Sequence, residues 1–312
     1  MIVSMTNQQN TTQSSSLRPL VLFTNDDGIA SPGLWASAAA FADFADVLVV
    51  APREQQSGTG RSMPVTSEGR IYAEEREIDG CRIQAYSVDG TPAQAVQHGI
   101  IELADRLPSL VVSGINYGEN CGSGVTISGT VGAALEAASM NIPALAVSQT
   151  TRHDLHLTYS QEVDFSVAAQ FTRRFGLWMM SARRPDDVDV LKVDIPLEAT
   201  PDTDWKITRI SRHRVYWPTR PERVALGDVG RIGYHFEGSP AKAEPNSDVY
   251  VVLHEKLVSV TPMSLDMTSR TDLFRLDQAI RAEASVNGAD EHAQRPVQEM
   301  RRKARYKAIA AD

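Results

Sequence analysis

The stretch PLVLFTNDDGIASPGLWASAAAFADFADVLVVAP, residues 19–52, decides the fold. It contains two continuous apolar runs, which are typical of strands buried on both faces of a sheet. Between them lies an alanine-rich segment in which Ser31 stands at the position of a helix N-cap and Pro32 at the first helical position. The stretch therefore predicts a strand–helix–strand unit.

The same alternation continues to about residue 150. Further apolar runs begin at Leu110 and Ala144, and helix-like segments begin near Thr91 and after Ser128. Strands that alternate with helices predict an α/β fold with a Rossmann-like, doubly wound and mostly parallel sheet over residues 19–150. In such a sheet ligands bind outside the carboxyl ends of the strands, so we expect the chemistry there.

The flanking parts of the chain have a different composition. Residues 151–280 combine a polar helix-like segment with alternating patterns at 206–217 and 248–268 that are typical of half-exposed strands. We expect this part to be an α+β extension with hairpin arms that completes the fold. Residues 1–18 are rich in Ser, Thr, Gln and Asn and predict a disordered leader, while 281–312 predict a polar tail.

Composition narrows the classes of function. The formal net charge is −8 over 312 residues, which argues against a surface that binds duplex nucleic acid or an anionic membrane. The two cysteines, Cys81 and Cys121, lack metal-ligand spacing and suit a reducing compartment. Because no apolar stretch approaches the roughly 20 residues of a membrane span, we expect a cytoplasmic protein.

The sharpest polar motif is TNDDG, residues 24–28, directly after the first apolar run. The adjacent carboxylates of Asp26 and Asp27 would repel each other unless a cation joined them. In an extended backbone their side chains alternate in direction, so one can bind a metal while the other assists it or holds a water. The competing interpretation is a solvated Asp-Asp-Gly turn.

Two glycine-rich loops follow later apolar runs. In APREQQSGTGRS, residues 51–62, Ser57 and Gly58 offer a hydroxyl oxygen and backbone N–H groups to a cation or a phosphate. In residues 113–137, Asn116 offers a neutral oxygen, and the helix that begins after Ser128 points N–H groups at an anion. Each loop by itself is compatible with an ordinary flexible connection.

All three motifs are predicted at one edge of the sheet. Their oxygen-rich side chains favour Mg²⁺ or Mn²⁺ with a phosphate ligand over zinc. Neither G-x-G-x-x-G nor a G-x-S-x-G elbow occurs, which disfavours an NAD-linked oxidoreductase on this sheet and a serine hydrolase.

The ordered motifs resemble those of the SurE family of 5′/3′-nucleotidases. They are NDDG at 25, APREQQSG at 51, GTPA at 90, SGINYGEN at 113, SGTVGAA at 128 and SVTPMSLD at 259. The resemblance spans roughly residues 19–270 and implies a metal-dependent phosphomonoesterase that hydrolyses nucleoside 5′-monophosphates, with 3′-monophosphates left open as further substrates. On physical grounds we expect attack by a metal-activated water rather than by an Asp nucleophile. It further implies homodimers or homotetramers formed through C-terminal arms.

The resemblance also implies the site residues. One divalent ion per subunit would be bound by Asp26, Asp27, Ser57 and Asn116, with Asp26 and Asp27 as the catalytic pair. The phosphate would be bound by Asn25, Gly58, Ser128, Gly129 and Thr130.

The chain departs from the family pattern at GTPAQA, residues 90–95, where the family usually has G-T-P-A-D-C, and in one loop. Ser123 and Gly124 replace acidic residues, and Ile127 replaces an aromatic residue. These changes leave the four ligand positions intact. They are also the basis of the alternative interpretation, a nucleotide-binding regulatory protein with weak or no turnover.

Overall fold

The computed structural model describes residues 17–156, 158, 160, 162–181 and 183–287. The chain divides into two units, Met1–Leu265 and Asp266–Asp312. The described part of the second unit contains helix α5, Leu273–Asn287. Most of the predicted leader and most of the predicted tail lie outside the described residues.

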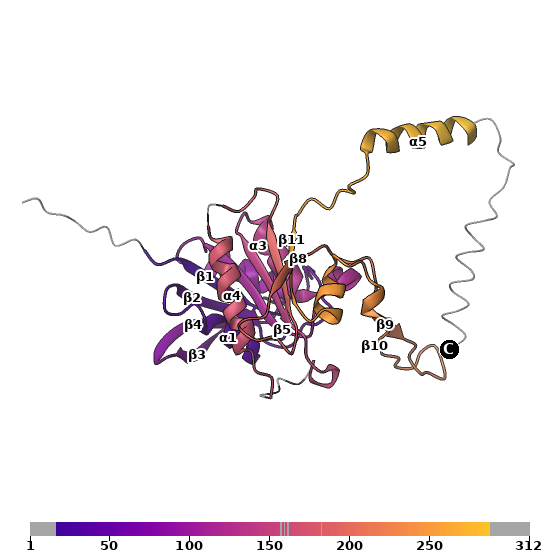
Figure 1. Cartoon of the computed structure of the whole chain (residues 1–312). Helices are drawn as coiled ribbons and strands as arrows, with labels where there is room; N and C mark the ends of the chain where they lie inside the picture. The colour runs from indigo at the N-terminus through magenta and orange to yellow at the C-terminus, as the bar shows by residue number, and fades with distance from the viewer. Residues whose placement is uncertain (1–16, 157, 159, 161, 182, 288–312) are drawn as a thin grey trace, which may run out of the picture. The chain divides into compact units, whose positions relative to one another are not determined.

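A nine-stranded sheet forms the centre of the first unit, in the order β3–β4–β2–β1–β5–β6–β7–β11–β8 (Figure 1). The strands are β1 (Leu20–Thr24), β2 (Asp46–Pro52), β3 (Ile71–Ile78), β4 (Cys81–Val88), β5 (Leu110–Tyr117), β6 (Ala144–Gln149), β7 (Val190–Ile195), β8 (Trp205–Ile207) and β11 (Val258–Met263). From β4 to β7 neighbouring strands are parallel, whereas β3 and β11 are antiparallel to β4 and β7. The mostly parallel α/β fold is therefore confirmed.

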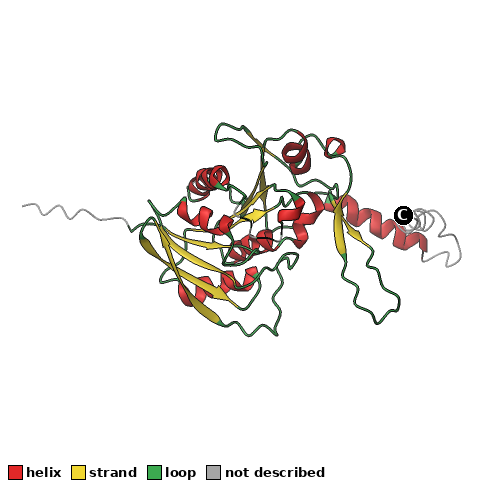
Figure 2. Ribbon diagram, turned by 90° about the horizontal axis from the view of Figure 1, so that it is seen from below, coloured by secondary structure: helices red, strands yellow, loops and turns green. Residues whose placement is uncertain are grey.

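Helices cover both faces of this sheet (Figure 2). One face carries α1 (Pro32–Ala39) and α4 (Ser166–Met179), and the other carries α2 (Pro92–His98) and α3 (Gly129–Ser139). In β1, Phe23 packs into the first of these cores and Leu22 into the second. Because both faces are buried, the strand reads as a continuous apolar run rather than an alternating one.

The remaining elements are short. They are the helical turns η1 (Gly99–Leu103), η2 (Gly122–Ile127), η3 (His153–Leu155), η4 (Pro240–Lys242) and η5 (Tyr250–His254), and the antiparallel hairpin of β9 (Tyr216–Thr219) and β10 (Gly233–Phe236). The hairpin lies within residues 151–280, and its role as an oligomer arm stays a prediction. No helix among the described residues is long and apolar enough to cross a membrane.

The alternating pattern over 248–268 predicted strand, and this prediction is wrong for the first half of the segment. Residues 250–254 form η5 instead, and only 258–263 form a strand. The side chains of Ser247 and Asp248 accept hydrogen bonds from the N–H groups of the next turn, which favours a helical start. The 206–217 pattern likewise forms strand only at its two ends.

The sheet order determines where a ligand can bind. From β1 the chain passes to β2 and β4 on one side, while β5, β6 and β7 lie on the other side. The point between β1 and β5 is a topological switch point, where adjoining connections lie on opposite faces of the sheet and leave a crevice at the strands' carboxyl ends. Asp26 and Asp27 follow β1 directly, and Asn116 lies near the end of β5.

A close approach of α1 to β5 provides a test of this packing. A Cβ atom on Gly33 would lie 2.1 Å from the backbone oxygen of Ile115, which cannot move without shifting the strand. We expect G33A to lower the free energy of unfolding by about 1–3 kcal/mol in urea titrations. The control is G227A, because a Cβ atom there meets nothing within 4 Å. Equal stability of the two variants would contradict the packing.

Candidate active site

Asp26 lies beyond the end of β1 and contacts the first turn of α3. The hydroxyl of Thr130 donates a hydrogen bond of 2.5 Å to its Oδ1. A Cβ atom on Gly129 would lie 2.7 Å from the Cβ of Asp26 and 2.8 Å from its Oδ2. Only glycine at position 129 therefore allows this carboxylate to reach the start of the helix.

Asp27 connects two further segments. Its Oδ1 accepts a hydrogen bond of 3.2 Å from the Nε2 of Gln55, and its Oδ2 accepts one of 3.2 Å from the backbone N–H of Tyr117. Gln55 belongs to the loop after β2, and Tyr117 ends β5. The carboxylate thus joins the loops at the carboxyl ends of three parallel strands.

The other two predicted metal ligands lie in the same segments. Asn116 is buried, and its Nδ2 donates to the backbone oxygens of Tyr117 and Gly118 at 3.3 and 2.7 Å. Its Oδ1 is therefore the atom it offers to a cation. Ser57 is exposed and follows Gln56, whose N–H donates to the backbone oxygen of Asp26 at 2.7 Å.

The predicted phosphate-binding residues begin α3. Ser128 is the N-cap, and its Oγ accepts a hydrogen bond of 3.1 Å from the N–H of Val131. The N–H groups of Gly129 and Thr130 lie on the Asp26 side and lower the pKa of that carboxyl. The Thr130 hydroxyl is bonded to Asp26 and the Val131 amide to Ser128, so an anion at this helix start would share the Gly129 and Thr130 amides with the Asp26 carboxylate.

Asn25 and Gly58 have different surroundings. The Asn25 amide closes the 25–28 turn, because its Oδ1 accepts from the N–H of Gly28 and its Nδ2 donates to the oxygen of the same residue. Gly58 is exposed with a φ of +79°, a conformation that favours glycine. Contact of either residue with a phosphate stays a prediction.

Burial makes the aspartate pair electrostatically expensive. Asp26 is 4% and Asp27 1% exposed. Burial raises the pKa of Asp26, and burial together with the charge of Asp26 raises the pKa of Asp27 well above its usual value. Burial therefore favours the protonated forms of this pair, and a divalent cation would stabilise the fully ionised form.

The sequence did not single out the residues that hold the Ser57 loop against α3. Arg61 donates to Glu136 at 2.6 Å, and Gln97 donates to the other oxygen of the same carboxylate at 2.7 Å. At Gly132 a Cβ atom would lie 2.3 Å from the oxygen of Gly60. One signal was present, since Glu136 is the only charged residue in α3.

The departures at Ser123, Gly124 and Ile127 lie together in η2. The N–H of Ser123 donates to the backbone oxygen of His213 at 3.3 Å, a Cβ atom on Gly124 would meet nothing within 4 Å, and Ile127 is 59% exposed. The η2 turn therefore forms without the acidic residues of the family pattern.

The raised pKa of Asp27 predicts a pH-dependent gain in stability for D27N in chelator. A raised native pKa contributes stability below the unfolded-state pKa, and this contribution is lost as the pH rises through the native pKa. The variant removes that loss, so near pH 7.5 the metal-free D27N should unfold at a higher urea concentration than the parent protein. Its free energy of unfolding should be higher by ~1.4 kcal/mol for each unit by which the native pKa is raised. The difference should shrink near pH 4.

Asp43 provides the control. Its exposed carboxyl is hydrogen-bonded to Arg173, which lowers its pKa, so D43N should be slightly less stable near pH 7.5. Lower stability of D27N than of the parent protein, in chelator at the same pH, would contradict the electrostatic account of the pair.

Comparison with known proteins places this site in a family. The model for "Survival protein SurE" matches residues 21–216. The "5′-nucleotidase SurE" of Thermococcus gammatolerans is 40% identical over 274 residues, which cover 86% of this chain and 98% of that protein. The protein of the same name from Methanocella arvoryzae is 39% identical over 266 residues, 84% of this chain and 97% of that protein.

A solved structure gives the same result. The crystal structure of the SurE protein from Aquifex aeolicus superposes with a TM-score of 0.66 at 31% identity, covering 85% of this chain and 100% of that chain. The matches run through the strands and loops that carry the aspartate pair, Asn116 and the start of α3. The resemblance seen in the motifs is confirmed, and this chain belongs to the SurE family.

Proposed function

We propose that this chain is a 5′-nucleotidase that hydrolyses nucleoside monophosphates to nucleoside and phosphate with one divalent cation per subunit. The observation that carries the proposal is the buried Asp26–Asp27 pair, set at the switch point of the sheet and against the first turn of α3. Relatives that match along nearly their full length are named 5′-nucleotidases, which supports the reaction.

The side chains at the site suit a hard cation. Mg²⁺ and Mn²⁺ prefer oxygen ligands, and Mg²⁺ in proteins is commonly held by one or two carboxylates. Asp26 and Asp27 supply carboxylates, Asn116 an amide oxygen and Ser57 a hydroxyl. Within the described part of the chain no three His, Cys, Asp or Glu side chains come together as a metal site, so the neutral oxygens would complete the coordination.

The proposed roles follow from position. A divalent cation bound there would lower the pKa of a coordinated water and neutralise charge on the phosphate. Thr130 holds the Asp26 carboxylate, while Gln55 and the Tyr117 amide hold that of Asp27. The amides that begin α3 bind phosphate oxygens, and one of the two aspartates assists proton transfer.

The test is release of inorganic phosphate from a panel of 5′- and 3′-nucleoside monophosphates with Mn²⁺, with Mg²⁺ and with chelator. We expect release that depends on metal and on the aspartate pair, with D26N lowering kcat by at least about a hundredfold. D105N is the control, since Asp105 is exposed in the loop before β5, at the opposite edge of the sheet.

Two outcomes would contradict the proposal. Full release in chelator would remove the metal from the reaction. Tight nucleotide binding with no release under any metal would favour the regulatory-protein interpretation. Rates on the 3′-nucleotides decide whether the proposed activity extends to them.

We also propose assembly into homodimers or homotetramers through the C-terminal arms. The loop between β9 and β10 presents Val224, Leu226, Val229 and Ile232, each more than two-thirds exposed. Apolar side chains gathered on a projecting loop are typical of a surface that is buried by association. Light scattering measures the number of subunits.

A further inference from the structure

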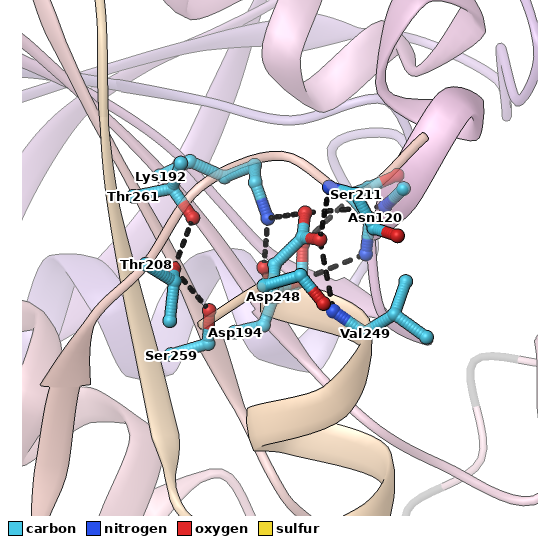
Figure 3. A network of polar contacts seen from close by, with 12 residues as sticks. Asn120, Lys192, Asp194, Thr208, Ser211, Asp248, Val249, Ser259 and Thr261 are labelled. Atoms are coloured by element: carbon cyan, nitrogen blue, oxygen red, sulfur yellow. Dashed lines mark hydrogen bonds and ion pairs between the residues drawn. The ribbon is translucent and has the colours of Figure 1, made fainter. Parts of the chain in front are cut away.

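A fully buried cluster of three charged side chains lies beside the proposed site (Figure 3). Lys192 and Asp194 come from β7, and Asp248 from the start of η5; all three are 0% exposed. The Nζ of Lys192 lies between the two carboxylates, bonded to Asp194 and 3.2 Å from Asp248. We call these three residues the Lys192 cluster.

The carboxylates of the cluster bind the loop that follows β5. Asp194 Oδ1 accepts a hydrogen bond of 2.8 Å from the N–H of Asn120, and Asp248 Oδ2 accepts one of 3.1 Å from the N–H of Gly122. The other oxygen of Asp248 accepts from the N–H of Ser211 at 2.9 Å. Two amides of residues 118–122 are therefore anchored to the interior of the protein.

Lys192 keeps its charge despite its burial. Burial by itself would lower the pKa of Lys192, but the charges of Asp194 and Asp248 outweigh it and raise that pKa, so the lysine stays ionised. Replacing a buried ion cluster by apolar side chains is often neutral or stabilising, so stability alone does not require these residues. What such a cluster does provide is fixed geometry, because each carboxylate oxygen has an assigned partner.

Residues that are paired across neighbouring strands connect the cluster with Asn116, a proposed metal ligand. Asn116 on β5 is the register partner of Ser148 on β6, and Ser148 is the partner of Asp194 on β7. Ser148 also accepts a hydrogen bond of 2.8 Å from the Nδ2 of Asn120. Neighbouring strands lie about 4.8 Å apart, so Asp194 is roughly 10 Å from Asn116.

We infer that the Lys192 cluster, together with Ser148, positions residues 118–122 and through them the Asn116 ligand and the start of α3. The inference rests on the proposed function. The loop leaves the strand two residues after Asn116 and leads through η2 to Ser128. Its displacement would therefore move a metal ligand at one end and the phosphate-binding amides at the other.

The experiment compares variants that release the loop with variants that cost stability elsewhere. S148A removes the acceptor of the Asn120 side chain and leaves the ion cluster intact. Its matched control is S87A, because Ser87 on β4 is an equally buried hydroxyl whose partner is Glu74 on β3, at 2.6 Å, rather than the loop. D194N should release the loop more strongly than S148A does. Its control is V193A, because Val193 lies on the same strand but packs in the apolar core of the α1–α4 face.

Two readouts are taken on samples shown by circular dichroism to be folded. Mn²⁺ affinity is measured by calorimetry, and hydrogen–deuterium exchange is followed over residues 118–122. We expect Mn²⁺ binding to weaken by about fivefold in S148A and at least about tenfold in D194N, with faster exchange of the loop. S87A and V193A should stay within about twofold of the parent protein at similar losses in Tm.

The outcomes separate the inference from the proposed function. Equal Mn²⁺ affinity and loop exchange in S148A and S87A would overturn the positioning role, and this pair decides the matter even if D194N does not fold. Failure of the parent protein to bind Mn²⁺ would instead contradict the proposed metal site, and the inference would fall with it.

Discussion

The burial of two adjacent carboxylates is the constraint on which the rest of the site depends. Asp26 and Asp27 are removed from water at the end of a central strand, where burial raises both pKa values and the charge of Asp26 raises the pKa of Asp27 further. Each is held by hydrogen bonds from a segment distant in sequence, Thr130 for the first and Gln55 for the second. Such an arrangement is costly to the fold, and the cation proposed to bind there would compensate the charge of the pair.

Glycines make this arrangement sterically possible. Gly129 lets Asp26 reach the helix start, Gly132 lets α3 approach the Ser57 loop, and Gly33 lets α1 lie against β5. In each case a single methyl group would meet backbone or carboxylate atoms at less than 3 Å. Residues of the larger types would separate the layers, and the segments that carry the proposed ligands would no longer converge.

A second group of buried charges supports the first. The aspartate pair contributes carboxylates to the proposed cation site. In the Lys192 cluster, by contrast, one lysine is shared by two carboxylates whose other partners are backbone N–H groups, two of them from the loop that follows β5. The two groups meet different physical requirements. A group that binds a cation needs charge that the protein leaves unpaired, whereas a group that fixes a loop needs all of its hydrogen bonds formed.

The sequence by itself determined the parallel α/β core and the segments that form the site. Continuous apolar runs and the helix starts at Ser31 and Thr91 are local signals, and all were confirmed. The β3–β4 hairpin was missed although Asp79-Gly80, both with positive φ, forms its turn. Only the tertiary structure decided that Gln55 meets Asp27 and that Lys192 meets Asp248, because local patterns report burial, whereas partners far apart along the chain are chosen by the topology of the sheet.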